Sequence, residues 1–180
     1  MLNKVRIRTK MLLKLRIQKE EDRNRKSSII KRKLFNTAIF KKAKNVMFYI
    51  SFDGEVDTQN MIKEAQKLGK IVTVPVCRKN RNMKACLLKD GVRLKKGLYG
   101  TQEPAVKDYL SVDSLDLVLV PGVAFDKKGA RLGRGKGFYD RFLAKLPAKA
   151  TSIGLAFRQQ ILPAIPSTVN DTRVHKLIFA

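Results

Sequence analysis

Three continuous apolar runs, separated by segments of different character, constrain the fold of this chain most strongly. The run at 46–52 is rich in aromatic and β-branched residues; apolar residues at helical spacing follow over 58–68, and a second run occupies 71–76. The third run lies at 115–120 and is broken only by Asp116. Short runs of this kind predict buried strands. A strand, a helix and a strand in one sheet almost always form a right-handed parallel crossover, so we expect a parallel sheet.

The rest of the chain extends this alternation. We expect helices at 2–19, from about Ser27 as N-cap, from Asp57 or Thr58 as N-cap, and at 138–146 before Pro147. We expect further strands at 83–88, 153–157 and 174–179. This order predicts an α/β fold, a three-layer sandwich with a mostly parallel central sheet flanked by helices, open and Rossmann-like. The length of 180 residues favours a single domain over 1–180, with the basic helical region 1–44 packed on it.

Positive charge is concentrated near the N-terminus. The chain has a formal net charge of +24, and residues 1–44 alone hold 16 basic and 3 acidic side chains. Such a balance points to phosphate, nucleic acid or another acidic partner. A nucleic-acid-binding module is therefore one hypothesis. Few aromatic residues stand among these basic ones, however, and no zinc-finger or RNA-recognition motif is present.

Other classes of protein are disfavoured by what the sequence lacks. The longest apolar stretches fall well short of the ~20 residues that cross a bilayer. Residues 1–19 carry Lys and Arg throughout and no apolar core, unlike a secretory signal. Cys77 and Cys86 stand without neighbouring ligand residues, which argues against zinc or a disulfide framework. We expect a cytoplasmic protein.

A glycine-rich basic segment at 121–141 is the most informative part of the sequence. It follows a predicted strand and opens a predicted helix, a position at the carboxyl edge of the sheet where ligands bind. Its glycines can bring backbone N–H groups close to an anion, and its basic side chains add positive charge, which together favour a polyphosphate. The spacing fits neither the P-loop nor the dinucleotide-binding G-x-G-x-x-G motif. The residues concerned are Arg131, Gly133, Arg134, Gly135, Lys136 and Gly137.

The same segment resembles a known family. Arg-Leu-Gly-Arg-Gly-Lys-Gly-Phe-Tyr-Asp-Arg at 131–141, preceded by Pro-Gly-Val-Ala-Phe-Asp at 121–126, is similar to the signature of 5-formyltetrahydrofolate cyclo-ligases, also called methenyltetrahydrofolate synthetases. Further landmarks follow the family order at 4–8, 55–58, 103–104 and 170–171. The resemblance implies cyclisation of 5-formyltetrahydrofolate to 5,10-methenyltetrahydrofolate with ATP and Mg²⁺. ADP and phosphate are released, and the intermediate is an iminophosphate, in which the formyl oxygen is phosphorylated.

The resemblance also implies roles for individual residues. The ATP-binding set is Lys4, Arg8, Arg131, Gly133, Arg134, Gly135, Lys136, Gly137 and Phe138. The folate-binding set is Ile50, Glu55, Phe138 and Tyr139; the catalytic set is Arg131, Arg134, Lys136 and Tyr139; the magnesium ligands are Asp140 and Asp171. Lys10 and Lys14 offer an alternative register for the N-terminal pair. Phe138 stands where the family commonly has tyrosine, so no hydroxyl is present at that position, while Tyr139 keeps one nearby.

Simpler interpretations stay open beside these roles. Glu55 and Asp57 could be solvated residues at a helix cap, and Asp140 could pair with Arg141, with Lys136 or with a helix terminus. A relative that binds nucleotide or folate without turnover is a further alternative, because fold alone does not establish chemistry. We expect a monomer whose partners are ATP and a folate with one or more glutamates in its tail. Nucleic acid is not required, and weak nonspecific binding of it would follow from charge alone.

Overall fold

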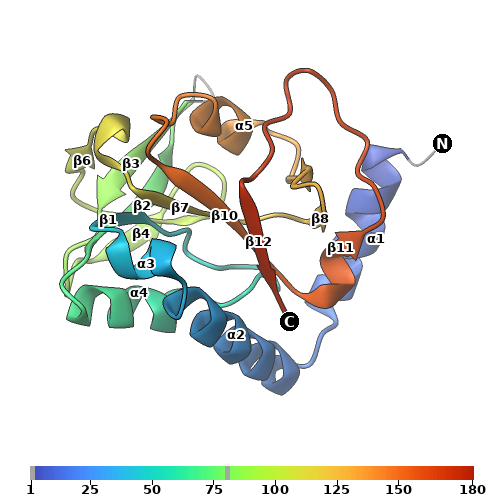
Figure 1. Cartoon of the computed structure of the whole chain (residues 1–180), viewed down its shortest axis with the longest axis horizontal. Helices are drawn as coiled ribbons and strands as arrows, with labels where there is room; N and C mark the ends of the chain where they lie inside the picture. Colours follow the sequence, from blue (N-terminus) through green and yellow to red (C-terminus); the bar gives the residue numbers. More distant parts are fainter. Residues whose placement is uncertain (1–2, 80–81) are drawn as a thin grey trace.

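The computed structural model describes residues 3–79 and 82–180 (Figure 1). Its helices are α1 (Lys4–Arg16), α2 (Glu20–Phe35), α3 (Ala38–Lys42), α4 (Gln59–Lys67) and α5 (Phe138–Leu143). Its strands are β1 (Asn45–Met47), β2 (Ile71–Cys77), β3 (Met83–Leu87), β4 (Leu94–Lys96), β5 (Gln102–Pro104), β6 (Tyr109–Leu110), β7 (Leu117–Val120), β8 (Ala124–Asp126), β9 (Arg131–Leu132), β10 (Thr151–Ala156), β11 (Ile161–Leu162) and β12 (Lys176–Phe179).

The central sheet has seven strands in the order β12-β10-β7-β1-β2-β3-β6. Neighbours from β12 to β2 pair in parallel, whereas β3 is antiparallel to β2 and β6 is antiparallel to β3. The strands β1 and β2 are joined through α4, which is the predicted crossover. The mostly parallel sheet predicted from the apolar runs is therefore confirmed.

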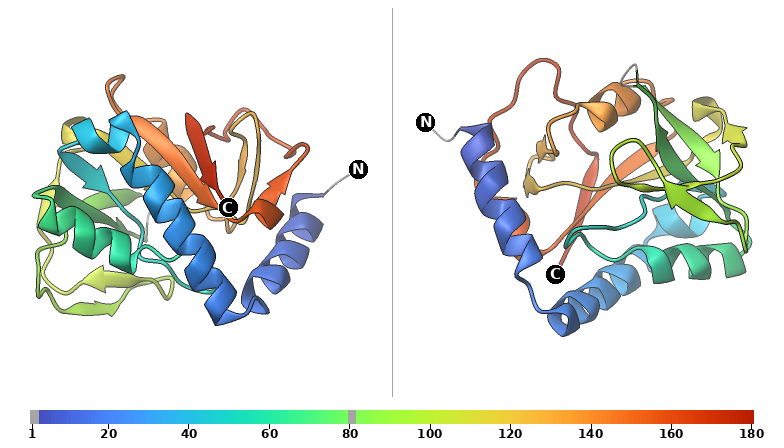
Figure 2. Two further views of the ribbon diagram at one scale, coloured as in Figure 1. Left: turned by 60° about the horizontal axis from the view of Figure 1, so that its bottom comes forward. Right: turned by 180° about the vertical axis from the view of Figure 1, so that it is seen from behind.

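Helices cover both faces of this sheet, so both faces are apolar. Along β7, Leu117 and Leu119 pack in the core shared with α2, α3 and α4, whereas Val118 and Val120 pack in the core shared with α5. This alternation follows from the two-residue period of a strand. Figures 1 and 2 show α2, α3 and α4 on one side of the sheet and α5 on the other. The predicted three-layer α/β sandwich is confirmed.

The N-terminal helices differ in detail from expectation. The helix α1 begins after Asn3, whose side chain accepts a hydrogen bond from Val5 N. The predicted helix start at Ser27 is wrong, because α2 already begins at Glu20. Three acidic residues in its first turn favour that start through the helix dipole. Ser27 is instead a buried residue inside α2, and its Oγ accepts a hydrogen bond from Asp57 N at 3.0 Å.

The predicted strand at 46–52 is shorter than expected. It ends at Met47, and only Phe48 N continues the pairing, donating to Thr73 O at 2.9 Å. The following backbone leaves the sheet because Thr58 Oγ1 donates to Tyr49 O at 2.5 Å and holds it to the N-cap of α4. Thr58, one of the two predicted caps, is the N-cap residue. The segment 49–58 thus forms a bend at the carboxyl end of β1.

Part of the segment 121–137, expected to be a loop, forms a second small sheet. Strands β8 and β9 form an antiparallel hairpin, and β11 pairs in parallel with β8. Asp126 Oδ1 accepts hydrogen bonds from Lys128 N and Ala130 N at 2.9 Å each, which closes the turn. The buried side chain of Ile7 packs α1 against this sheet. The hairpin therefore presents Arg131 from a fixed strand, close to α1.

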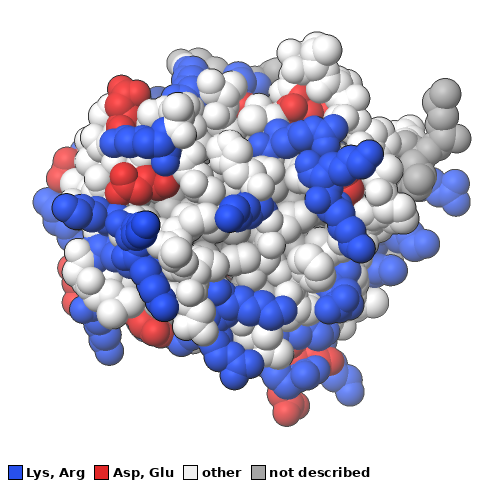
Figure 3. All heavy atoms as spheres, viewed as in Figure 1, with Lys and Arg blue, Asp and Glu red and all other residues white. Residues whose placement is uncertain are grey.

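Basic side chains are dispersed over the surface. On the face drawn in Figure 3, Lys and Arg side chains spread over the whole view, with Asp and Glu between them, and do not gather in one groove. Among the described residues, no helix combines the length and the apolar character needed to cross a membrane.

Candidate active site

A cavity of about 390 Å³ lies at the carboxyl ends of β1, β2 and β7, between α1 and the segment 133–137. All fourteen predicted site residues line it, although they come from segments far apart in the chain. They are Lys4, Arg8, Ile50, Glu55, Arg131, Gly133, Arg134, Gly135, Lys136, Gly137, Phe138, Tyr139, Asp140 and Asp171. The structure brings these residues together, while the role of each remains a prediction.

The glycines at 133–137 leave room for the arginines beside them. A Cβ at Gly133 would lie 2.7 Å from Arg131 Nη1, so a larger residue would displace that guanidinium. Gly137 has φ of +66° at the N-cap of α5, and Gly135 has φ of +99°. Such values favour glycine because side chains with a Cβ rarely adopt them. The loop is thus shaped to keep its backbone and Arg131 open to the cavity.

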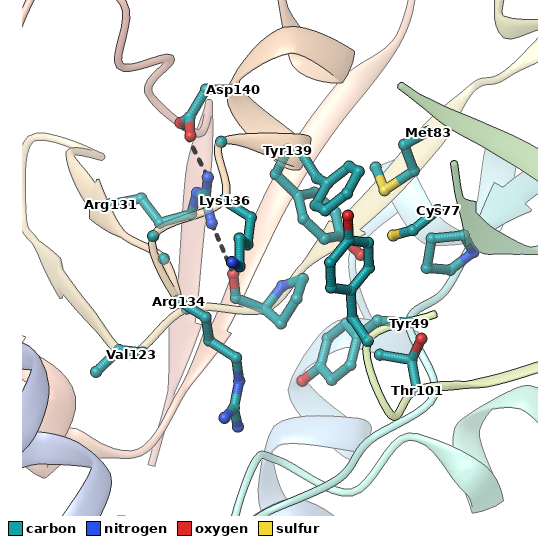
Figure 4. A pocket seen from close by; sticks show the side chains of 18 of the residues that line it. Tyr49, Cys77, Met83, Thr101, Val123, Arg131, Arg134, Lys136, Tyr139 and Asp140 are labelled. Carbon is teal, nitrogen blue, oxygen red and sulfur yellow. Dashed lines mark hydrogen bonds and ion pairs between the residues drawn. The ribbon is translucent and has the colours of Figure 1, made fainter. Parts of the chain in front are cut away.

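Arg131 is a buried cation at the wall of the cavity. Its exposure is only 6%, its Nη2 lies 2.9 Å from Asp140 Oδ1, and its Nη1 donates to Pro121 O at 3.3 Å (Figure 4). Its Nε is buried without a hydrogen-bond partner. Asp140 therefore pairs with Arg131, not with Arg141 or Lys136 as the local sequence allowed. A buried guanidinium with unused donor capacity is suited to binding an anion.

Two cations of α1 reach the same cavity. Lys4 Nζ lies 2.5 Å from Asp171 Oδ2, and Arg8 Nε donates to Gly133 O at 2.9 Å. Their spacing of one helical turn places both on one face of α1. Burial acts to raise the pKa of Asp171, but hydrogen bonds from Lys4 and Thr168 outweigh burial and lower it. Asp171 is therefore a stable anion in this structure.

The two predicted magnesium ligands are close neighbours. Thr172, next to Asp171 in the chain, donates from its Oγ1 to Asp140 O at 2.9 Å and from its N to Asp140 Oδ1 at 3.4 Å. Carboxylate oxygens suit Mg²⁺, which commonly uses one or two protein carboxylates together with water and phosphate oxygens. Among residues 3–79 and 82–180, no three Asp, Glu, His or Cys side chains form a metal-binding group. The donor set thus fits a cation that arrives with a phosphate ligand.

Glu55 is a buried acid that lines the cavity beside Arg134, in the half that carries the cations. Its Oε1 lies 3.3 Å from Arg134 Nε, and its Oε2 accepts a hydrogen bond from Phe52 N at 3.3 Å. Burial raises the pKa of Glu55 to about 7, and the charge of Arg134 only partly opposes this. Glu55 is thus not the solvated cap residue of the simpler interpretation. It can change its protonation state near neutral pH.

Aromatic and apolar side chains form the other half of the cavity. Figure 4 shows Tyr49, Cys77, Met83 and Thr101 on one side, away from Arg131 and Arg134. Tyr139 lies between the two groups, with the Arg131 guanidinium carbon 5.4 Å from the centre of its ring. Tyr139 Oη is buried without a partner, and burial raises its pKa well above the usual value. Burial also raises the pKa of Cys77 to about 11, which keeps the thiol neutral. This half can contact a flat, largely apolar ring.

Sequence reasoning missed several residues that line the cavity or bind its lining residues. The turn between β4 and β5 places Tyr99 against Phe138, with ring centroids 5.0 Å apart, and Lys136 Nζ lies 5.9 Å from the ring of Tyr99. Thr101 and Gln102 line the cavity from the same hairpin. Asp53, which pairs with Arg134, was missed as well. No local motif marks these residues; an aromatic residue near the matched pair at 103–104 was the only signal.

Comparisons with known proteins identify the family of this chain. A sequence profile of the 5-formyltetrahydrofolate cyclo-ligase family matches residues 1–180. The mouse 5-formyltetrahydrofolate cyclo-ligase is 31% identical, covering 96% of this chain and 91% of its own. The *Escherichia coli* K12 protein of the same name is 36% identical over 69% of this chain and 71% of its own.

The solved structures give the same result. The NMR structure of *Aquifex aeolicus* 5,10-methenyltetrahydrofolate synthetase has a TM-score of 0.86 and 32% identity, covering 98% of this chain and 89% of its own. The synthetase from *Mycoplasma pneumoniae*, with a TM-score of 0.81 and 20% identity over 98% of both chains, supports the fold alone. Matched along its whole length, the chain belongs to the 5-formyltetrahydrofolate cyclo-ligase family, a family of ligases.

Proposed function

We propose that this protein converts 5-formyltetrahydrofolate to 5,10-methenyltetrahydrofolate in an ATP- and Mg²⁺-dependent reaction that releases ADP and phosphate. The observation that carries the proposal is the division of one cavity into a cationic half and an aromatic half, lined also by the buried acid Glu55 beside Arg134. Such a cavity can hold a polyphosphate and a flat heterocycle side by side. Family membership supports the same activity.

The cationic half would bind the phosphates of ATP. Lys4 and Arg8 approach from α1, and Arg131 and Lys136 come from β9 and the glycine-rich segment that follows it. A buried guanidinium and backbone N–H groups at glycines are strong ligands for phosphate oxygens. Asp140 and Asp171 would hold Mg²⁺, which would neutralise charge on the transferred phosphoryl group.

The aromatic half would bind the folate. The pterin ring carries N–H groups that an ionised Glu55 can accept as hydrogen bonds. Ile50, Phe138 and Tyr139 would contact the faces and edges of the ring system. Because Glu55 also lies beside Arg134, the folate would be held next to the phosphate-binding residues.

The reaction requires a poor leaving group to become a good one. The formyl oxygen attacks the γ-phosphorus, the bond to the bridging oxygen breaks, and ADP leaves. The nitrogen at position 10 then attacks the formyl carbon of this iminophosphate, loses its proton, and phosphate departs as the ring closes. Arg131, Arg134 and Lys136 would stabilise the negative charge on the transferred group, and catalysis would rest on this and on positioning. Tyr139 Oη, which has no partner, could hydrogen-bond the reacting oxygen.

The test is a direct assay of product. Purified protein is mixed with 5-formyltetrahydrofolate, and the absorbance of the methenyl product is followed at mildly acidic pH with and without ATP and Mg²⁺. We expect product only when both are present, and loss of product in Arg131→Ala. Arg25→Ala, an exposed arginine of α2 paired with Asp22, is the matched control and should retain activity. Binding of both ligands without product would instead identify a non-catalytic relative.

A further inference from the structure

Asp53 lies beside the cavity and is bonded to arginines from two distant parts of the chain. Its Oδ1 and Oδ2 accept hydrogen bonds from Arg16 Nε and Nη2 at 2.7 and 3.0 Å. Its Oδ2 also accepts a hydrogen bond from Arg134 Nη1 at 2.8 Å. The chain order places these residues 37 and 81 positions from Asp53. One carboxylate therefore joins the end of α1 to the arginine of the glycine-rich loop.

The backbone at Asp53 is held in an unusual conformation. Asp53 has φ of +51°, and within residues 3–79 and 82–180 it is the one non-glycine residue with positive φ. The next residue, Gly54, lies against α1 so closely that a Cβ would be 2.4 Å from Leu15 O. Aspartate tolerates this conformation better than most residues, but it still costs free energy. Such strain persists only where the surrounding structure holds it, and here it aims the carboxylate at Arg134.

Arg134 is consequently fixed by three contacts. Asp53 binds its Nη1, Glu55 binds its Nε, and the ring of Phe52 lies 4.1 Å from its guanidinium carbon. Its side chain is still 30% exposed, and its Nη2 has no hydrogen-bond partner. Glu55 is a shared partner, because binding of the pterin would compete for its oxygens. Asp53, which is paired with Arg16, does not take part in that competition.

We propose that Asp53 is a positioning residue which, anchored by Arg16 of α1, holds Arg134 in place so that Glu55 is free to bind the folate. The inference rests on the proposed function. Without Asp53, Glu55 would be the sole carboxylate partner of Arg134 and would pair with it more tightly. Folate would then have to break that pair, and Arg134 would move away from the transferred phosphoryl group. Both the KM for folate and kcat would suffer.

The test is a double-mutant cycle between Asp53 and Arg134. Asp53→Asn removes the charge but keeps the shape, and asparagine also tolerates positive φ. We expect this variant to lose about tenfold to a hundredfold in kcat/KM for 5-formyltetrahydrofolate, with KM raised and kcat lowered. In an Arg134→Met background the same substitution should have no further effect. Asp22→Asn, which removes the same charge from an exposed ion pair on α2, is the matched control and should change nothing.

The outcomes separate positioning from structural support. A loss in Asp53→Asn that persists in full in the Arg134→Met background would mean that Asp53 only supports the fold, and the proposal would be wrong. No loss in Asp53→Asn would also overturn it. Should Asp53→Asn fail to fold, Arg16→Met replaces it in the same cycle, because Arg16 anchors Asp53. We expect a smaller loss of kcat/KM in Arg16→Met, and no loss when Arg134→Met is also present.

A readout without substrate keeps this test apart from the proposed function. In an NMR spectrum of the free protein, the Arg134 Nη1–H signal, which Asp53 holds, should be protected from exchange with water. Asp53→Asn should abolish that protection, while the Nε–H signal held by Glu55 and the backbone spectrum are retained. An unchanged Arg134 signal would refute the positioning role even if the enzyme turns over. Conversely, loss of protection in a protein that forms no methenyl product would support the positioning contact and refute the proposed function.

Discussion

Replacing Glu55 by Gln should weaken folate binding and, at the same time, stabilise the fold at alkaline pH. Burial raises the pKa of Glu55 from its usual 4.5 to about 7, so the carboxyl is mostly neutral at pH 6 and mostly ionised at pH 8. The ionised fraction rises about tenfold over this interval. If the ionised form accepts the N–H groups of the pterin, the KM for 5-formyltetrahydrofolate should fall by about tenfold from pH 6 to pH 8. Glu55→Gln should raise KM about tenfold to a hundredfold at pH 8 and remove this pH dependence.

Although Glu55→Gln should weaken folate binding, it should increase the free energy of unfolding. A carboxyl whose pKa is raised in the folded state binds more protons when folded than when unfolded, between pH 4.5 and about 7. The free energy of unfolding of the wild type therefore falls as pH rises through this window. At about 1.4 kcal/mol per pKa unit, the ionised Glu55 costs the fold about 3 kcal/mol above pH 7. Gln carries no such cost.

Urea denaturation at pH 5 and pH 8 measures this cost. The stability advantage of Glu55→Gln over the wild type should grow by about 2–3 kcal/mol between the two pH values. Asp22→Asn, at an exposed carboxylate, serves as the control. A difference between Glu55→Gln and wild type that does not change with pH would refute the raised pKa. A KM that is flat with pH in the wild type would refute the role of the ionised form.

Three further predictions concern the cationic half of the cavity. Arg131→Ala and Lys136→Ala should each lower kcat/KM for ATP by about a hundredfold in steady-state assays. The control Cys77→Ser should stay within about twofold of wild type, because the Cys77 thiol is neutral. Equal losses in all three variants would show that the site is misassigned. Gly133→Ala should raise the KM for ATP several-fold, because its Cβ would lie 2.7 Å from Arg131 Nη1, and an unchanged KM would exclude that contact. Asp171→Asn should raise the Mg²⁺ concentration needed for half-maximal activity, which a Mg²⁺ titration measures; an identical titration curve would remove Asp171 from the metal site.

The fold was predictable where burial left a strong local pattern. Strands such as β2 and β7 are continuous apolar runs because helices cover the sheet on both faces, and the run length alone identified them. The hairpin β4–β5 gave no such pattern, since every residue of β4 is exposed. Strands β8 and β9 are only three and two residues long, too short for any periodicity. The start of α2 was misplaced because serine is a common N-cap residue. In the structure, the Oγ of Ser27 instead accepts a hydrogen bond from Asp57 N.

The candidate site was predictable to the extent that it lies in one contiguous motif. The residues at 131–140 form a single string, and the resemblance added Lys4, Glu55 and Asp171 from elsewhere in the chain. Tyr99 reaches the cavity only through the exposed hairpin β4–β5, and its contact with Phe138 is purely tertiary. The pairing of Asp53 with Arg134 depends on a backbone conformation that no local pattern indicates. Long-range contacts of this kind require the structure.

The coupling between phosphate release and ring closure tests most directly whether the two halves of the cavity act as one site. Purified protein with ATP, Mg²⁺ and 5-formyltetrahydrofolate is assayed for phosphate and for methenyl product in the same reaction. We expect one phosphate per methenyl group formed, and neither product when ATP or the folate is omitted. Phosphate release that proceeds equally without folate, or methenyl formation that needs no ATP, would contradict a shared phosphate- and folate-binding active site.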